Sequence, residues 1–117
     1  MIRRIDASRA LAIPGVRAVI TGDDCDMAYG VIPIAQNEFP LARERVRYCG
    51  EPIAAVAADD IDSARAALNA LELELKPLPG YFDAAAARAG DALPLHSNKP
   101  GNIEREVDHV FGDIDGA

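Results

Sequence analysis

The chain has 117 residues, which is enough for one domain with a single hydrophobic core. Its formal net charge of −7 argues against nucleic-acid binding, because contacts with the phosphate backbone need clustered cations. Only 5% of the residues are aromatic and none is Trp, so little surface is available for stacking a planar ligand or a base.

The first part of the chain is predicted to form two short strands on either side of a helical turn. Residues 2–6 are predicted to be a strand, and residues 7–12 a turn of helix that Pro14-Gly15 ends. Residues 16–21 alternate between two faces, which is typical of a strand, and Gly22-Asp23-Asp24 breaks it.

Residues 25–45 are predicted to be a long irregular excursion with a short extended piece at residues 31–35. A structureless loop of this length is uncommon inside a compact domain. Its apolar and unpatterned content leads us to expect that residues 26–45 face a partner. The Arg-rich stretch at residues 43–47 is interpreted first as a solvated strand edge and second as a protein contact.

The middle of the chain predicts strand, helix and strand in close succession, the order of a crossover unit. Residues 46–49 and 53–58 are predicted to be strands. Asp59-Asp60 then begin a helix over residues 61–71, where apolar residues recur at a spacing of three to four. Residues 71–77 switch to period two and are predicted to be a strand.

The last part is predicted to hold a short helix and a final strand. The helix covers residues 84–89, with Asp83 as its N-cap and Gly90 at its end. Residues 103–111 alternate in the way that fits a strand with one mixed face. Ile103, Arg105, Val107, His109 and Phe111 fall on one side, against Glu104, Glu106, Asp108 and Val110. Gly112-Asp113 is interpreted as the start of another helix.

Together these elements predict an α+β fold. We expect the six strands to form one mixed sheet with the 61–71 helix packed on one face. The side chains expected in the core are Ile20, Val56, Leu68, Leu73 and Leu75.

The residues that most often carry chemistry are few and isolated in this sequence. Cys25 and Cys49 have neither metal-ligand nor redox spacing, so two reduced thiols are expected. His96 and His109 lack a carboxylate or thiol at ligand spacing, and each is interpreted as a surface or strand residue. No catalytic or metal-binding role is assigned to any of the four.

The remaining polar motifs have simpler structural explanations. Asp23-Asp24 suits a turn and Asp59-Asp60 a helix cap, while Glu72 and Glu74 lie on the solvent side of a strand. Gly50-Glu51-Pro52 has one glycine and no helix beside it, so it cannot cradle a phosphate. No serine has the surroundings of a nucleophile elbow, and the candidates are Ser8, Ser63 and Ser97.

Several segments together resemble the α/β-hammerhead domain of the xanthine dehydrogenase and aldehyde oxidase family. The segments that carry the resemblance are Arg4–Ser8, Pro14–Asp24, Val46–Ala58, Leu73–Pro79, His96 and Gly101-Asn102. In that family the domain opens the molybdopterin-binding large subunit. The resemblance runs from Ile2 to Ala117, and it implies a single hammerhead domain over residues 1–117 that is a piece of a much longer subunit.

The resemblance implies a non-catalytic structural domain within a molybdenum oxidoreductase. The family's molybdenum-site residues belong to later domains, so none is carried over here as catalytic, cofactor-binding or metal-binding. Molybdopterin, iron–sulfur clusters and FAD are implied for the parent complex. The implied partners are the remaining molybdopterin domains and the iron–sulfur and FAD subunits, and dimerisation of the isolated domain stays open. One departure is Leu75, where the family usually has an aromatic residue.

A narrower resemblance points to the α subunit of 4-hydroxybenzoyl-CoA reductase, which removes a ring hydroxyl from an aromatic acyl-CoA. Residues 29–38 and 99–107 carry it. The alternatives are the hammerhead domain of a xanthine, aldehyde or CO dehydrogenase-type hydroxylase, and a stand-alone α+β module that binds a ligand or dimerises. No apolar run reaches the roughly 20 residues of a membrane helix and no signal-peptide core is present, so a cytoplasmic location is expected.

Overall fold

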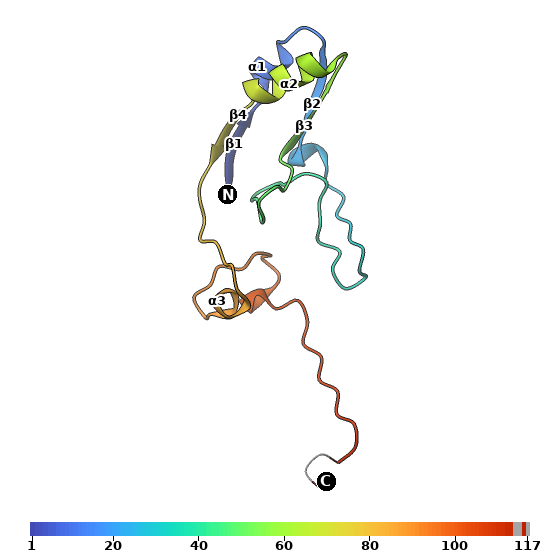
Figure 1. Ribbon diagram of the computed structural model, residues 1–117, viewed down its shortest axis with the longest axis vertical. Helices are drawn as coiled ribbons and strands as arrows, with labels where there is room; N and C mark the ends of the chain where they lie inside the picture. The colour runs from blue at the N-terminus through green and yellow to red at the C-terminus, as the bar shows by residue number, and fades with distance from the viewer. Residues whose placement is uncertain (114–115, 117) are drawn as a thin grey trace. The chain divides into compact units, whose positions relative to one another are not determined.

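The computed structural model describes residues 1–113 and 116 of the chain (Figure 1). The chain divides into two compact units, Met1–Leu78 and Pro79–Ala117. The elements of the first unit are β1 (Ile2–Asp6), α1 (Ser8–Leu11), β2 (Val16–Thr21), the 3-10 turn η1 (Gly22–Asp24), β3 (Ala54–Ala58), α2 (Ile61–Ala70) and β4 (Glu72–Leu75). Those of the second are α3 (Ala84–Arg88) and the 3-10 turn η2 (Pro100–Asn102).

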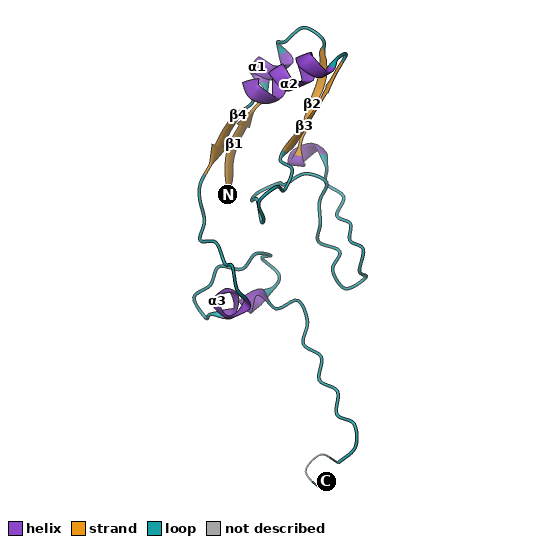
Figure 2. Ribbon diagram, viewed as in Figure 1, coloured by secondary structure: helices purple, strands orange, loops and turns teal. Residues whose placement is uncertain are grey.

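The strands of the first unit form two separate antiparallel pairs rather than the predicted mixed sheet (Figure 2). β1 pairs with β4, where Ile5 lies opposite Leu73, and β2 pairs with β3, where Val19 lies opposite Val56. The two strands that flank α2 therefore lie in different sheets, so the predicted crossover within one sheet is wrong. Period-two alternation identifies a strand, but it does not identify the strand's partner.

The main helix is close to its prediction, because local signals set both of its ends. The Asp60 carboxylate accepts hydrogen bonds from Ser63 N and Ser63 Oγ, each at 2.8 Å, which caps the first turn. The backbone hydrogen bond from Ser63, followed by that of its hydroxyl, lowers the pKa of Asp60 below its ordinary value. The helix ends at Ala70, where Leu71 turns to an extended backbone.

Asp59 has a different role from the predicted cap. Arg17 donates Nε and Nη2 to the two carboxylate oxygens of Asp59, both at 2.7 Å. Asp59 N also donates to Gly15 O at 2.8 Å. The residue joins the start of β2 to the end of β3 through a two-point contact and a backbone bond.

Three alanines and one leucine are the buried apolar residues that the structure describes, and none of the five predicted core residues is among them. The buried apolar residues are Ala10, Leu41, Ala42 and Ala67. Val56 is half-buried. The other four predicted core residues are exposed, at 41% for Ile20, 50% for Leu68, 46% for Leu73 and 48% for Leu75. A two-stranded sheet offers too little surface to bury long side chains, whereas alanines let α1 and α2 approach closely.

Two predicted strands do not occur among the described residues. Residues 46–49 lead into a turn, because Glu51 N donates to Tyr48 O at 3.2 Å and Gly50 has a φ of +95°. Residues 103–111 contain no strand. The helix expected after Gly112-Asp113 falls partly on residues 114, 115 and 117, which lie outside the described residues.

The short helix of the second unit is confirmed. Asp83 caps α3 by accepting a hydrogen bond from Ala86 N at 2.8 Å. α3 ends at Arg88, and the extended backbone of Ala89 breaks it before Gly90. No helix among the described residues has the length and apolar character to cross a membrane.

Candidate functional site

The polar residues weighed in the sequence act as structural partners. Asp24 accepts from Thr21 N at 2.8 Å and closes a capping box at η1. Glu72 pairs with Arg9 at 3.2 Å and Arg4 at 4.0 Å. The ring of His109 stacks on that of Phe111, with centroids 6.0 Å apart.

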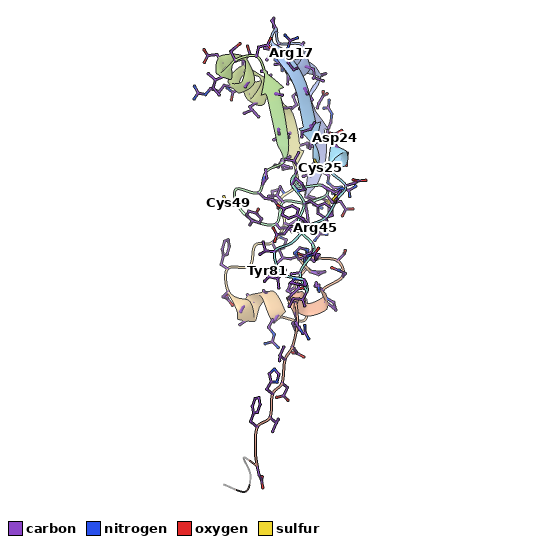
Figure 3. All side chains as sticks on the ribbon, turned by 90° about the vertical axis from the view of Figure 1, so that its right-hand side faces the viewer. Arg17, Asp24, Cys25, Arg45, Cys49 and Tyr81 are labelled. Atoms are coloured by element: carbon purple, nitrogen blue, oxygen red, sulfur yellow. The ribbon has the colours of Figure 1, made fainter. Side chains whose placement is uncertain are left out.

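The described residues bring no three His, Cys, Asp or Glu side chains into position to hold a metal ion. Cys25 and Cys49 are free thiols, and Cys49 is exposed (Figure 3).

Segment 41–44 is the best-anchored part of the long excursion. Leu41 and Ala42 are 5% and 1% exposed. Ala42 N donates to Pro52 O at 2.7 Å, and Ile2 N donates to Glu44 O at 2.9 Å. Gly22 lies so close that an added Cβ would stand 2.4 Å from Ala42 O. The excursion therefore packs into the core of the first unit at this point.

A hollow of about 220 Å³ lies beside this anchor in the first unit. Its lining residues are Ile2, Arg3, Arg4, Ile5, Thr21, Gly22, Asp23 and Arg43. Arg4 is already engaged with Asp6 and Glu72, and the Arg43 guanidinium lies 5.5 Å from the centre of the Phe39 ring. With two of its three arginines engaged, the hollow forms no concentrated anion site.

The rest of the excursion forms a hairpin over residues 27–39, which we call the apolar hairpin (Figure 1). Tyr29 and Glu38 exchange backbone hydrogen bonds of 2.9 and 3.0 Å. Ala35 N donates to Ile32 O at 2.9 Å, which forms a turn where an extended piece was predicted at residues 31–35. Gln36 Nε2 donates to Gly30 O at 3.1 Å. The hairpin is thus internally bonded.

The apolar hairpin presents large side chains to solvent. The exposed fractions are 79% for Met27, 48% for Tyr29, 90% for Val31, 57% for Ile32 and 49% for Ile34. Scattered apolar residues are normal on a surface, but a contiguous group on an ordered loop is typical of a protein–protein contact. Residues 26–45 are expected to face a partner, but Leu41 and Ala42 are buried within the first unit. The surface available to a partner is therefore mainly the apolar hairpin.

The ion pair between Arg47 and Glu51 in the first unit is not among the sequence predictions. Arg47 N donates to the Glu51 carboxylate, and Arg47 Nη1 lies 3.4 Å from Glu51 Oε1. The two side chains are 23% and 9% exposed. The sequence signal for this pair is the i, i+4 spacing of opposite charges, which brings side chains together in a helix or turn but not in the strand predicted at residues 46–49. This pair closes the turn that precedes β3.

In the second unit, the side chain of Asn102 bonds to two stretches of backbone, one at Ala87 and one at residues 93–95. Its Oδ1 accepts from Leu95 N at 2.6 Å, and its Nδ2 donates to Ala87 O at 2.8 Å and Leu93 O at 3.2 Å. Asn102 has a φ of +54°, a conformation that Asn tolerates better than most residues. The hydroxyl of Tyr81 accepts from Leu93 N at 2.7 Å and adds a further tie (Figure 3).

Comparison with protein families matches residues 1–79 to the model described as aldehyde oxidase and xanthine dehydrogenase, a/b hammerhead domain. The aldehyde oxidoreductase of Megalodesulfovibrio gigas is 36% identical over 124 residues, covering 98% of this chain and 14% of that protein. The nicotinate dehydrogenase large molybdopterin subunit of Eubacterium barkeri is 33% identical, covering 97% of this chain and 26% of that subunit.

Among solved structures, the Cu,Mo-CO dehydrogenase in its carbon monoxide-reduced state superposes with a TM-score of 0.73 at 29% identity. The match covers 98% of this chain and 16% of that chain. The chain therefore spans only a small part of the length of the relatives that it matches.

Proposed function

The chain belongs to the a/b hammerhead domain family of aldehyde oxidase and xanthine dehydrogenase, and on this premise we propose that it is a non-catalytic structural domain of a molybdopterin-dependent oxidoreductase large subunit. The observation that carries the proposal is the apolar hairpin, whose bonded backbone presents Val31 and Ile32 to solvent. Such a surface suits packing against another protein surface. We propose the remaining domains of the same subunit as its partner, with iron–sulfur and FAD subunits in the same complex.

The cofactor of the parent enzyme is proposed to bind outside this chain. A pterin cofactor presents many polar atoms and requires hydrogen-bonding groups in an enclosed site. The buried residues that the structure describes include no polar or charged side chain, and the described residues offer no metal-holding group. They do not fit molybdopterin, so no chemical step is assigned to them. Molybdopterin, iron–sulfur clusters and FAD are proposed for the parent complex.

For the parent reaction we propose reductive dehydroxylation of an aromatic acyl-CoA, as in 4-hydroxybenzoyl-CoA reductase. The support is the sequence resemblance of residues 29–38, which lie in the apolar hairpin, and of residues 99–107. The alternative is an aldehyde, xanthine or CO dehydrogenase-type hydroxylase, which is favoured by the aldehyde oxidoreductase and CO dehydrogenase relatives.

We also propose a cytoplasmic location. The support is that Cys25 and Cys49 are free thiols, which suit a reducing compartment.

The coding sequence on both sides of the chain tests the proposal. The expected result is an open frame that continues beyond Ala117 into several hundred residues of molybdopterin-domain sequence. A stop codon with no such sequence nearby contradicts the proposal and favours a stand-alone binding or dimerisation module.

A binding measurement tests the role of the apolar hairpin. The double variant Val31→Ser, Ile32→Ser is expected to weaken association of this domain with the rest of the subunit at least tenfold, because it removes exposed apolar contact area. Ile61→Ser is the matched control, since Ile61 is 63% exposed on α2, outside the apolar hairpin. Equal binding by the double variant and the unchanged chain refutes a docking role for the hairpin.

A further inference from the structure

The segment at residues 104–111 has the side-chain pattern of a strand but no strand partner among the described residues of the second unit. No backbone–backbone hydrogen bond joins residues 104–111 to another described residue of the second unit. Figure 2 draws the described residues after η2 as a loop. His109 and Phe111, two residues apart, stack at an interplanar angle of 22°, which places both rings on the same side of the backbone, as in a strand.

The two faces of this segment differ in chemistry. One face carries Val107, His109 and Phe111, with Val107 62% and Phe111 82% exposed, and Arg105 lies at its N-terminal end. The other carries three acidic residues followed by Val110. The acidic residues are Glu104, which pairs with Lys99 at 2.7 Å, Glu106 and Asp108. A strand with one mainly apolar and one mainly acidic face suits a position where the first face is covered and the second meets solvent or basic side chains.

We propose that residues 104–111 form a β-strand by adding to the edge of a sheet in the remainder of the longer subunit. This inference rests on the proposed function, because it requires further domains of the same polypeptide. Unpaired strand backbone is a ready template for pairing with a sheet edge, and the bonds formed do not depend on side-chain identity. The acidic face adds selectivity for an edge with Lys or Arg opposite it.

A second copy of this chain is a poorer partner for the segment. In a symmetric antiparallel pair centred on Val107, Glu106 of one copy lies opposite Asp108 of the other, and the same repulsion occurs twice. Like charges directly opposite each other destabilise a strand pair. The CO dehydrogenase match covers 98% of this chain but 16% of that chain, so in this relative the matched region belongs to a much longer polypeptide.

Amide hydrogen exchange tests the proposal in two samples, the 117-residue chain and the full subunit. In the 117-residue chain, the amides of residues 104–111 are expected to exchange at the unprotected rate. In the full subunit, alternate amides are expected to exchange at least 100-fold more slowly, because neighbouring N–H groups point to opposite edges. Unprotected amides in the full subunit overturn the proposal, as does protection already present in the chain alone.

Two proline variants of the full subunit sharpen the test. Val107→Pro and Asp108→Pro remove neighbouring N–H groups, and only one of these faces the paired edge. The expected result is that one variant abolishes the protection of its neighbours and the other retains most of it. Equal effects overturn strand addition. Absence of any longer subunit refutes the proposed function, whereas a full subunit with an unprotected segment refutes this inference alone.

Discussion

Replacing Gly22 by Ala is expected to destabilise the first unit through a backbone clash. An added Cβ would lie 2.4 Å from Ala42 O, 2.8 Å from Ala42 C and 2.8 Å from Arg43 Cα. All three are backbone atoms of the anchored segment, so no flexible side chain can move aside. Gly22 does not have a positive φ, and the effect therefore comes from contact rather than from backbone strain.

The size of this effect follows from the usual cost of overpacking, about 1–3 kcal/mol. A domain of 60–100 residues loses roughly 4–8 °C in Tm for each kcal/mol, and the first unit spans Met1–Leu78. Thermal unfolding followed by circular dichroism measures the shift. Gly90→Ala is the matched control, because a Cβ there meets nothing within 4 Å and its φ is not positive. Equal midpoints for the two variants refute the clash and the anchoring of segment 41–44.

Three further predictions concern Asp60 at the start of α2, Leu68 within α2 and Asn102 in the second unit. The pKa of Asp60 is lowered in the folded state, so its stabilisation is complete above the unfolded aspartate pKa of about 3.9 and is lost as the pH falls through the lowered value. Asp60→Asn keeps a capping side chain but should reduce the fall of Tm at acid pH. A fall of Tm equal to that of the unchanged chain contradicts a contribution of the Asp60 carboxylate to stability. Leu68→Ala should cost on the order of 1 kcal/mol in urea unfolding rather than 2–5, because Leu68 is 50% exposed, and a loss above 2 kcal/mol means that the side chain is buried. Asn102→Gly retains the left-handed backbone but deletes three hydrogen bonds, so amide exchange at Leu95 should accelerate; an unchanged rate rejects the role of Asn102 as a tie.

Local signals made the helices predictable. The start of α2 follows from Asp60 and the start of α3 from Asp83, since each carboxylate accepts a backbone hydrogen bond three residues further on. The apolar spacing then fixed the length of α2 to within one residue. These interactions span a few residues, so the sequence contains them directly.

Strand partners and the core were not predictable in the same way. The alternation of Leu73 and Leu75 identified β4, but nothing in the sequence showed that β4 pairs only with β1 and leaves both side chains about half exposed. Long-range pairing depends on how the whole chain closes, and a short window does not contain that information.

The hydrogen bonds made by the Asn102 side chain were also not predictable from the sequence. Asn102 bonds to residues 7, 9 and 15 positions away, and only the folded backbone brings these together. The apolar hairpin was predicted as a surface facing a partner, because its apolar content is visible in the sequence. Its internal bonding between Tyr29 and Glu38 was not visible. Composition therefore suggested a contact surface, and the structure supplied its shape.

Molybdenum content is the most direct test that this chain contributes framework and not chemistry. The 117-residue chain, purified from cells that make molybdopterin, should contain no molybdenum above background by mass spectrometry. The full subunit from the same cells should contain about one molybdenum per molecule. Molybdenum bound at a similar ratio to the short chain, with molybdopterin released on denaturation, would contradict the account.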